Sequence, residues 1–270
     1  MVRIIHATVR TVGIVLVALS VTTPAWANGS ELPKDPFRSV MWKSMAERFF
    51  IDGPIEFDER VIVSAPSHAE DQFHVPITVD ASALSDVRQI VAVADLNPIP
   101  HILTVRPEQA MSFVGFRVKL QQSTPIHVGV QTKDGVWHIG GAYVDAAGGG
   151  CTAPAAMHGT ENWMDTLGIT RTVARRSVFD HARMTVKMRH PMDTGLAAGI
   201  PAFFMNELKI TDDNGVLVAE VDLYEPVSEN PTLTLLPKML SEEASRLRVN
   251  ARDTEGNEYA FALDVPAASQ

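Results

Sequence analysis

Short apolar runs separated by turn residues recur from residue 60 to residue 265, and this pattern constrains the fold more than any other feature of the sequence. Val87–Ala94 is almost continuously apolar, whereas Met111–Leu120 alternates apolar and polar side chains, and both patterns are typical of β-strands. Lys133-Asp134-Gly135 and Asp212-Asp213-Asn214-Gly215 carry hairpin turn residues. The sequence shows no βαβ alternation and no phosphate-binding loop, so we predict an all-β fold.

The predicted strands form two groups of seven, each the size of one immunoglobulin-like β-sandwich. The first group lies within residues 51–147 and comprises Arg60–Val63, Phe73–Val79, Val87–Ala94, His101–Val105, Met111–Leu120, Pro125–Thr132 and Val136–Val144. The second group lies within residues 168–266 and comprises Thr170–Val178, Ala182–Arg189, Ala202–Ile210, Val216–Tyr224, Thr232–Leu236, Leu247–Ala251 and Tyr259–Val265. We therefore predict two sandwiches in one chain, joined through the segment 148–167.

The residues before the first sandwich divide into an export signal and a short helix. Residues 1–27 contain Arg3 and Arg10, an apolar stretch over 11–19 and a small-x-small cleavage pattern at 25–27, which together indicate a secretory signal peptide. The apolar stretch is shorter than the roughly 20 residues of a membrane-spanning helix. Residues 28–50 form a polar lead-in and then a short amphipathic helix within 37–50, expected to cover a sheet edge or end. We expect an exported, periplasmic protein without a membrane span.

The only cysteine of the chain, Cys151, follows Gly148, Gly149 and Gly150 between the two predicted sandwiches. Three successive glycines favour a hinge because glycine tolerates backbone conformations that other residues avoid. Lone cysteines usually pack as small buried hydrophobes, but the residues around this one show no strand or helix pattern. We expect a flexible arm that holds an exposed thiol clear of both sandwiches. No internal disulfide is possible with one cysteine.

The charge of the chain limits its partners. The formal net charge is −9 at pH 7, and removal of residues 1–27 takes away Arg3 and Arg10 but no acidic residue, which gives −11. An acidic surface argues against nucleic acid or an anionic membrane as the partner. The sequence implies no cofactor and no metal-binding motif of recognisable spacing.

The order of several short motifs resembles the SoxYZ sulfur-carrier family. The first half is similar to the SoxY part, and the second half is similar to the SoxZ part. The SoxY-like motifs are Gly53-Pro54-Ile55, Val75–Val79, Asn97-Pro98-Ile99-Pro100, Val118–Thr124, Lys133-Asp134-Gly135 and the glycine-cysteine arm. The SoxZ-like motifs are His190-Pro191-Met192-Asp193-Thr194-Gly195, Ile200-Pro201 and Ser228-Glu229-Asn230-Pro231.

This resemblance implies a fusion of two immunoglobulin-like sandwiches that pack together as the two family subunits do. It also implies a non-enzymatic carrier in which Cys151 holds a sulfur-containing intermediate covalently, with Gly148, Gly149 and Gly150 as the hinge. The chain looks like the single-chain carriers associated with quinoprotein dehydrogenases. The implied partners are periplasmic oxidoreductases or sulfur-handling enzymes, among them a PQQ-dependent dehydrogenase.

The arm departs from the family pattern after the cysteine. The family arm ends in Gly-Gly-Cys-Gly-Gly at a free C-terminus, whereas Thr152-Ala153-Pro154 and a second domain follow here. A cysteine tethered on both sides enters a partner as a loop of two strands, which needs roughly 5 Å more width than a free tail. The usual sulfur-oxidising partners are therefore in doubt for this chain.

Two other functions stay open at the level of sequence. The chain can be a docking module for a periplasmic dehydrogenase in which Cys151 is incidental, since a sandwich fold does not decide function. It can also bind a soft metal such as copper(I), which prefers thiolate, thioether and imidazole ligands. The residues that offer such ligands are Cys151, Met157, His158, His181, His190 and Met192.

Overall fold

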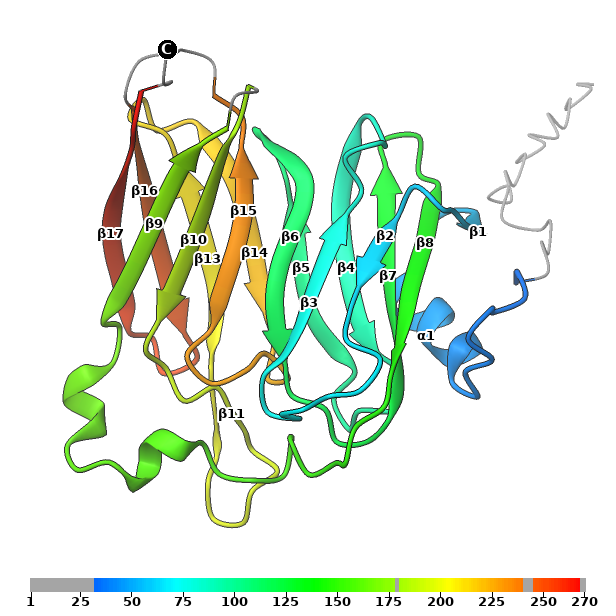
Figure 1. Ribbon diagram of the computed structural model, residues 1–270, viewed down its shortest axis with the longest axis horizontal. Helices are drawn as coiled ribbons and strands as arrows, with labels where there is room; N and C mark the ends of the chain where they lie inside the picture. Colours follow the sequence, from blue (N-terminus) through cyan, green and yellow to red (C-terminus); the bar gives the residue numbers. More distant parts are fainter. Residues whose placement is uncertain (1–31, 178–179, 240–244, 268–270) are drawn as a thin grey trace, which may run out of the picture. The chain divides into compact units, whose positions relative to one another are not determined.

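The computed structural model describes residues 32–177, 180–239 and 245–267, and the predicted signal peptide, 1–27, lies outside these ranges (Figure 1). Strands dominate the described chain, and one short α-helix, α1 (Trp42–Phe49), precedes them. The strands form two immunoglobulin-like sandwiches, as predicted. No helix among the described residues has the length and apolar character needed to cross a bilayer.

Two large sheets contain most of the strands, and both sheets run through both halves of the sequence. The nine-stranded sheet has the order β1 (Ile55–Phe57), β8 (Trp137–Val144), β7 (Thr124–Thr132), β4 (Val87–Ala94), β5 (His101–Arg106), β14 (Leu217–Leu223), β13 (Met205–Thr211), β16 (Ser245–Asp253) and β17 (Glu258–Val265). The six-stranded sheet has the order β2 (Ile62–Ser64), β3 (Val75–Asp80), β6 (Ala110–Val118), β15 (Thr232–Pro237), β10 (Ala182–Met188) and β9 (Thr170–Arg176).

The two halves, which the segment 148–167 links along the chain, also meet by strand pairing in each sheet, a contact that the sequence did not specify. β5 pairs antiparallel with β14, with Val105 opposite Val221, and β6 pairs antiparallel with β15, with Val114 opposite Leu235. Figure 1 shows β6 beside β15 in the middle of one layer. Both halves contribute to one continuous hydrophobic core between the sheets.

The helix α1 covers a sheet face and not an edge or end as predicted from the sequence. The outer face of the large sheet in the first half is apolar at Val91 and Val93 of β4 and at Trp137 and Ile139 of β8. Trp42 and Phe50 pack there with Trp137 in a second hydrophobic cluster. The sequence showed β4 as an almost continuously apolar strand, a pattern that indicates burial on both faces but does not identify the element that covers the outer one.

The lead-in before α1 is fixed by a buried histidine between two carboxylates. His127 on β7 is fully buried, with its Nδ1 2.9 Å from Asp95 Oδ1 and its Nε2 3.1 Å from Asp35 Oδ1. Asp35 also accepts hydrogen bonds from the backbone N–H groups of Phe37 and Ser39. Burial lowers the pKa of His127, but the two carboxylates outweigh it and raise the pKa above its ordinary value. This cluster ties the start of the described chain to the first sandwich.

Candidate functional site: the docked cysteine arm

The glycine-cysteine arm follows β8 and lies against the loop after β6. Gly149 N–H donates to the carbonyl oxygen of Gln121 at 3.1 Å, and Gly150 N–H donates to that of Leu120 at 3.0 Å. The segment that leads from β8 to β9 runs along one end of both sandwiches, beside the loop that carries β11 (Asp193–Thr194), as Figure 1 shows. The arm is therefore docked in this structure, with its backbone hydrogen-bonded to the first half.

The glycines of the arm meet two separate requirements of this docking. Gly148 and Gly149 have positive φ values of 98° and 90°, which residues with side chains rarely adopt. Gly150 has no positive φ, but a Cβ there would lie 2.6 Å from the carbonyl oxygens of Gln72 and Leu120. These glycines therefore permit a close approach of two backbones. Their predicted role as a hinge for movement stays a prediction.

Cys151 is buried, with 1% of its surface exposed, so the expectation of an exposed thiol standing clear of the sandwiches is wrong for this structure. Its Sγ donates to the carbonyl oxygen of Lys119 at 3.5 Å, and its backbone N–H donates to Oε1 of Gln121 at 3.1 Å. Cys151 belongs to neither hydrophobic cluster. Polar contacts along the backbone hold it, which local sequence patterns did not reveal because the acceptors lie some 30 residues away.

The second half closes the site with the loop His190–Gly195. Thr194 Oγ1 donates to the carbonyl oxygen of Cys151 at 2.6 Å, and the carbonyl oxygen of Met192 accepts from Lys119 Nζ. Met192 has a φ of 54°, a left-handed conformation that is uncommon outside glycine. Its N–H donates to Nδ1 of the buried His190 at 3.2 Å, which supports that turn. These contacts place the loop over the cysteine.

A buried lysine and the buried thiol share this site. Burial raises the pKa of Cys151 to about 11, although the Lys119 ammonium lowers it in part. Burial lowers the pKa of Lys119 to about 8, and the nearby acidic groups, Cys151 first among them, oppose that shift. A thiol with this pKa is almost fully protonated at neutral pH, and the thiolate is the nucleophile. In the docked arm Cys151 is therefore a poor nucleophile at neutral pH.

A cavity of about 170 Å³ lies beside the arm and is lined by both halves of the chain. Gly150 and Ala153, which lie on either side of the cysteine, line it together with Lys119. The second half contributes Met192 and Glu229, among other residues. The site thus forms only where the arm, the loop after β6 and the His190–Gly195 loop come together.

Two of the ligands proposed for a soft metal, His158 and His190, have other partners in the structure. His158 Nε2 lies 2.8 Å from Asp193 Oδ2, and His190 contacts the backbone of Met192. In the part of the chain that the structure describes, no group of three or more His, Cys, Asp or Glu ligand atoms within 4.8 Å of one another includes Cys151. The arrangement gives no support to a copper site built on that sulfur.

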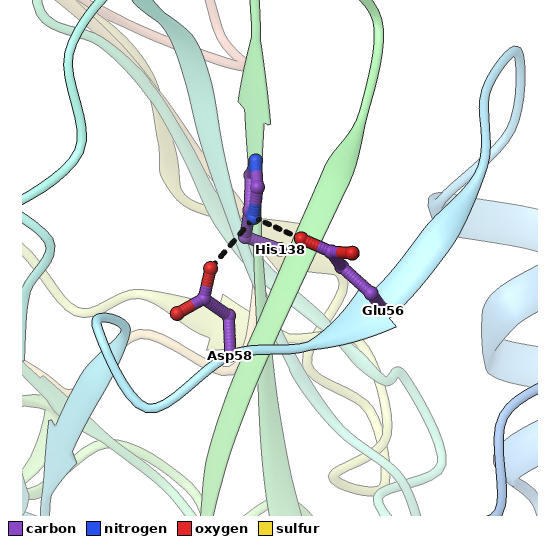
Figure 2. A group of neighbouring side chains, drawn as sticks. All are labelled: Glu56, Asp58 and His138. Atoms are coloured by element: carbon purple, nitrogen blue, oxygen red, sulfur yellow. Dashed lines mark hydrogen bonds and ion pairs between the residues drawn. The ribbon is translucent and has the colours of Figure 1, made fainter.

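One cluster of potential metal ligands does occur among the described residues, at the other side of the first sandwich. Figure 2 shows His138 Nδ1 facing two carboxylates, Asp58 Oδ2 at 2.8 Å and Glu56 Oε1 at 3.0 Å. Arg60 also binds both oxygens of Asp58, with Nε at 3.0 Å from each. Asp58 therefore has two partners, His138 and Arg60, and its contact with Arg60 is an ion pair.

Asp58→Asn tests this network. Hydrogen bonds from Arg60 lower the pKa of Asp58 from 3.8 to about 2, so the carboxylate stabilises the fold above pH 3.8 and this contribution is lost as the pH falls through about 2. We expect Asp58→Asn to reduce the free energy of unfolding by about 1 kcal/mol or less at pH 7, because such partly solvated pairs contribute little. Urea unfolding of both proteins from pH 7 to pH 2 should show the difference shrinking toward acid. A difference that does not vary with pH would contradict this assignment.

Sequence reasoning identified the cysteine and its glycines but not the residues that hold them. Lys119 and Gln121 lie within the motif Val118–Thr124, and Thr194 lies within His190–Gly195. Both motifs were noted for their order along the chain, without a role for any side chain. One signal was available in the sequence, namely Lys119 at the end of the predicted strand Met111–Leu120. Lysine is rarely buried, so this position alone did not indicate a buried side chain.

Two protein-family models match the chain in tandem. The first, described as sulfur oxidation protein SoxY, matches residues 46–151 and so ends at the cysteine. The second, described as sulphur oxidation protein SoxZ, matches residues 171–262. No curated protein sequence matches the chain significantly.

Solved structures also resemble parts of the chain. The sulfur carrier protein SoxY from Chlorobium limicola f thiosulfatophilum shares 24% sequence identity, with 38% of this chain and 88% of that chain covered and a TM-score of 0.33. Fibronectin(III)-like modules of Clostridium thermocellum CbhA share 8% identity, with 76% of this chain and 94% of that chain covered and a TM-score of 0.23. At these TM-scores the two structures carry no argument about function.

Proposed function

We propose that this chain, which belongs to the SoxY and SoxZ families of sulfur oxidation proteins as a single-chain fusion, carries a sulfur-containing group covalently on Cys151. The observation that carries the proposal is the way in which the cysteine is held. It lies on a segment without regular secondary structure, outside both hydrophobic clusters, and polar contacts to its backbone fix it. A structural cysteine would instead pack among apolar side chains.

The docked arm represents the resting state of this carrier. The thiol is buried and protonated there, so a partner cannot reach it and it does not react with solvent oxidants. Release requires the loss of a few hydrogen bonds, each of which contributes about 1 kcal/mol net, and not the opening of a core. Undocking exposes Cys151 and returns its pKa toward the ordinary range, which makes it a competent acceptor.

Loading is a group transfer to the exposed thiolate. The Cys151 sulfur forms a bond to a sulfur atom of the donor, and the bond between that atom and its leaving group breaks. The leaving group takes the electron pair, and the solvent returns to it the proton that the thiol lost. Delivery to the next partner is the same exchange in the opposite sense, so the carrier itself is neither oxidised nor reduced over a cycle and acts as a non-enzyme.

The test compares the intact protein with Cys151→Ser. We expect the protein purified from its native host to show an adduct mass located on Cys151 by intact-mass and peptide mass spectrometry. Cys151→Ser should lose the adduct completely and lose its function in the host, with an unchanged circular dichroism spectrum and melting temperature. An adduct on another residue, or a fully functional Cys151→Ser protein, would overturn the proposal.

The second candidate is a docking module in which Cys151 is incidental. The burial of the thiol specifically favours it, because a cysteine that never leaves the docked position can only support the loop. The same experiment separates the two functions, since this candidate predicts a Cys151→Ser protein that binds its partner and keeps its function. Whether Cys151 leaves its docked position is tested separately, by the reactivity of its thiol.

The location and the partners of the carrier follow from the sequence. We propose a periplasmic protein, because residues 1–27 have the pattern of a secretory signal. The partners are oxidoreductases or sulfur-handling enzymes with an entrance wide enough for a loop, and a PQQ-dependent dehydrogenase is the one that the resemblance suggests. Fractionation of the host and co-purification with the tagged protein test both statements.

A further inference from the structure

Four basic side chains face the solvent on the outer face of β9 and β10, two neighbouring strands of the six-stranded sheet (Figure 1). Alternation along the strands directs Ala174, Met184 and Val186 to the hydrophobic core and the residues between them to the opposite side. We call that side the basic face. It consists of Arg171, Val173 and Arg175 on β9 and of Arg183, Thr185 and Lys187 on β10, all exposed except the half-buried Thr185.

The strand register places like charges directly opposite each other on the basic face. Arg175 lies opposite Arg183. Arg171 lies opposite Lys187. Like charges in such cross-strand positions destabilise a sheet. No carboxylate among the described residues lies within 4.0 Å of a side-chain nitrogen of these four cations, so the repulsion within each pair is not compensated by a neighbouring ion pair.

The exposed side of the large sheet in the same half of the chain is charged in a different way. Arg246 Nε lies 2.7 Å from Asp264 Oδ1 there. Lys209 Nζ lies 3.3 Å from Glu220 Oε1. Residues 170–189 instead contain six Arg and Lys residues and one acidic residue, in a chain with a net charge of −9. The positive charge is therefore concentrated on one sheet and is paired on the other.

Protection of an exposed sheet edge explains only part of the basic face. β9 is the last strand of its sheet, and charged side chains on an edge strand oppose pairing with other chains. That role fits Arg171 and Arg175. β10 lies between β9 and β15 and pairs with both, so Arg183 and Lys187 have no edge to protect. These two cations need another role.

We propose that the basic face is a docking surface for an acidic patch on a partner protein. Carboxylates of the partner relieve the repulsion within both like-charged pairs, and Val173 at the centre, 55% exposed, adds apolar contact area. The net charge of −9 repels larger polyanions, such as nucleic acid or an anionic bilayer, which extend beyond this face. The inference goes beyond the proposed function, because the basic face does not include Cys151 and serves a carrier and a docking module alike.

The first experiment titrates the full chain with poly-L-glutamate at low salt, followed by isothermal titration calorimetry. We expect Arg175→Glu combined with Arg183→Glu to weaken binding by about tenfold or more, because both cations become anions. Arg88→Glu combined with Lys133→Glu, at exposed positions of the first half, changes the net charge equally and should have little effect. Cys151→Ser should bind as the unmodified protein does. If the first double variant fails to fold, Arg175→Gln with Arg183→Gln removes the same cations without reversing their charge.

The second experiment finds the partner in an extract of the native host. A carbodiimide joins a lysine amine directly to a carboxylate in contact with it. We expect mass spectrometry of the tagged protein to show Lys187 linked to an Asp or Glu side chain of another protein. The link should be lost at high salt, which screens exposed charges, and in the Arg175→Glu, Arg183→Glu protein, which keeps Lys187.

Three results would overturn the docking surface. The first is equal weakening of poly-L-glutamate binding by the two double variants, which would reduce the effect to net charge. The second is the absence of any link from Lys187 to another protein. The third is tighter binding to vesicles of anionic phospholipid or to a DNA duplex than to poly-L-glutamate, which would assign the basic face to a membrane or a nucleic acid.

Discussion

Gly150→Ala is expected to raise the reactivity of the Cys151 thiol about 100-fold at pH 8. A Cβ at position 150 would lie 2.6 Å from two backbone oxygens, of Gln72 and Leu120, which cannot move aside as a flexible side chain can. The arm must then leave its docked position. The pKa of the thiol returns from about 11 toward its ordinary value of 9.0. The thiolate fraction at pH 8 accordingly increases from about 0.1% to about 10%.

The measurement is the second-order rate of reaction with an aromatic disulfide reagent, followed by absorbance in the unmodified protein and the variant. Gly159→Ala is the matched control, because a Cβ there meets nothing within 4 Å and Gly159 is not among the residues with positive φ. The control should react as slowly as the unmodified protein. Equal rates for all three proteins at equal thermal stability would show that the arm is not held as the structure describes, and the resting state would be wrong.

The sequence revealed only part of this site. The glycines and the cysteine are visible as a pattern, and we interpreted them as a hinge and an exposed thiol. In the structure Gly150 instead allows a backbone contact with Leu120, and Thr194, more than 40 residues further on, closes the site. Contacts between segments so distant in sequence leave no local periodicity, so burial of this thiol could not be predicted from the residues around it.

The fold was easier to predict than the site because strand patterns are local. Val87–Ala94 has the same bounds in the prediction and in the structure, and the fold class is confirmed. The short strand β1 was missed, since three residues cannot show alternation. The sharing of both sheets between the halves was missed as well. It depends on the pairing of the edge strands β5 with β14 and β6 with β15, which no pattern within one strand specifies.

His127→Leu is expected to reduce the free energy of unfolding by about 3–5 kcal/mol near neutral pH. The histidine is fully buried between Asp95 and Asp35, and leucine would leave two carboxylates in a buried site without their cation. The rings of Trp42 and Phe37 contact the imidazole at centroid distances of 4.8 Å and 5.4 Å, so the lead-in and α1 lose their anchor as well. Urea unfolding, followed by tryptophan fluorescence, measures the loss.

The loss of unfolding free energy caused by His127→Leu should depend on pH. The pKa of His127 is raised in the folded protein, so its charged form stabilises the fold fully below the unfolded value of about 6.5. This contribution is lost as the pH rises through the folded-state pKa. The difference between the unmodified protein and His127→Leu should therefore decrease as the pH rises from about 6.5 through the folded-state pKa of His127. His68→Leu, at a largely exposed histidine, should change stability little at any pH. A His127→Leu effect that grows with increasing pH would mean that the imidazole is neutral in the fold, and that Asp35 and Asp95 do not act as its counter-ions.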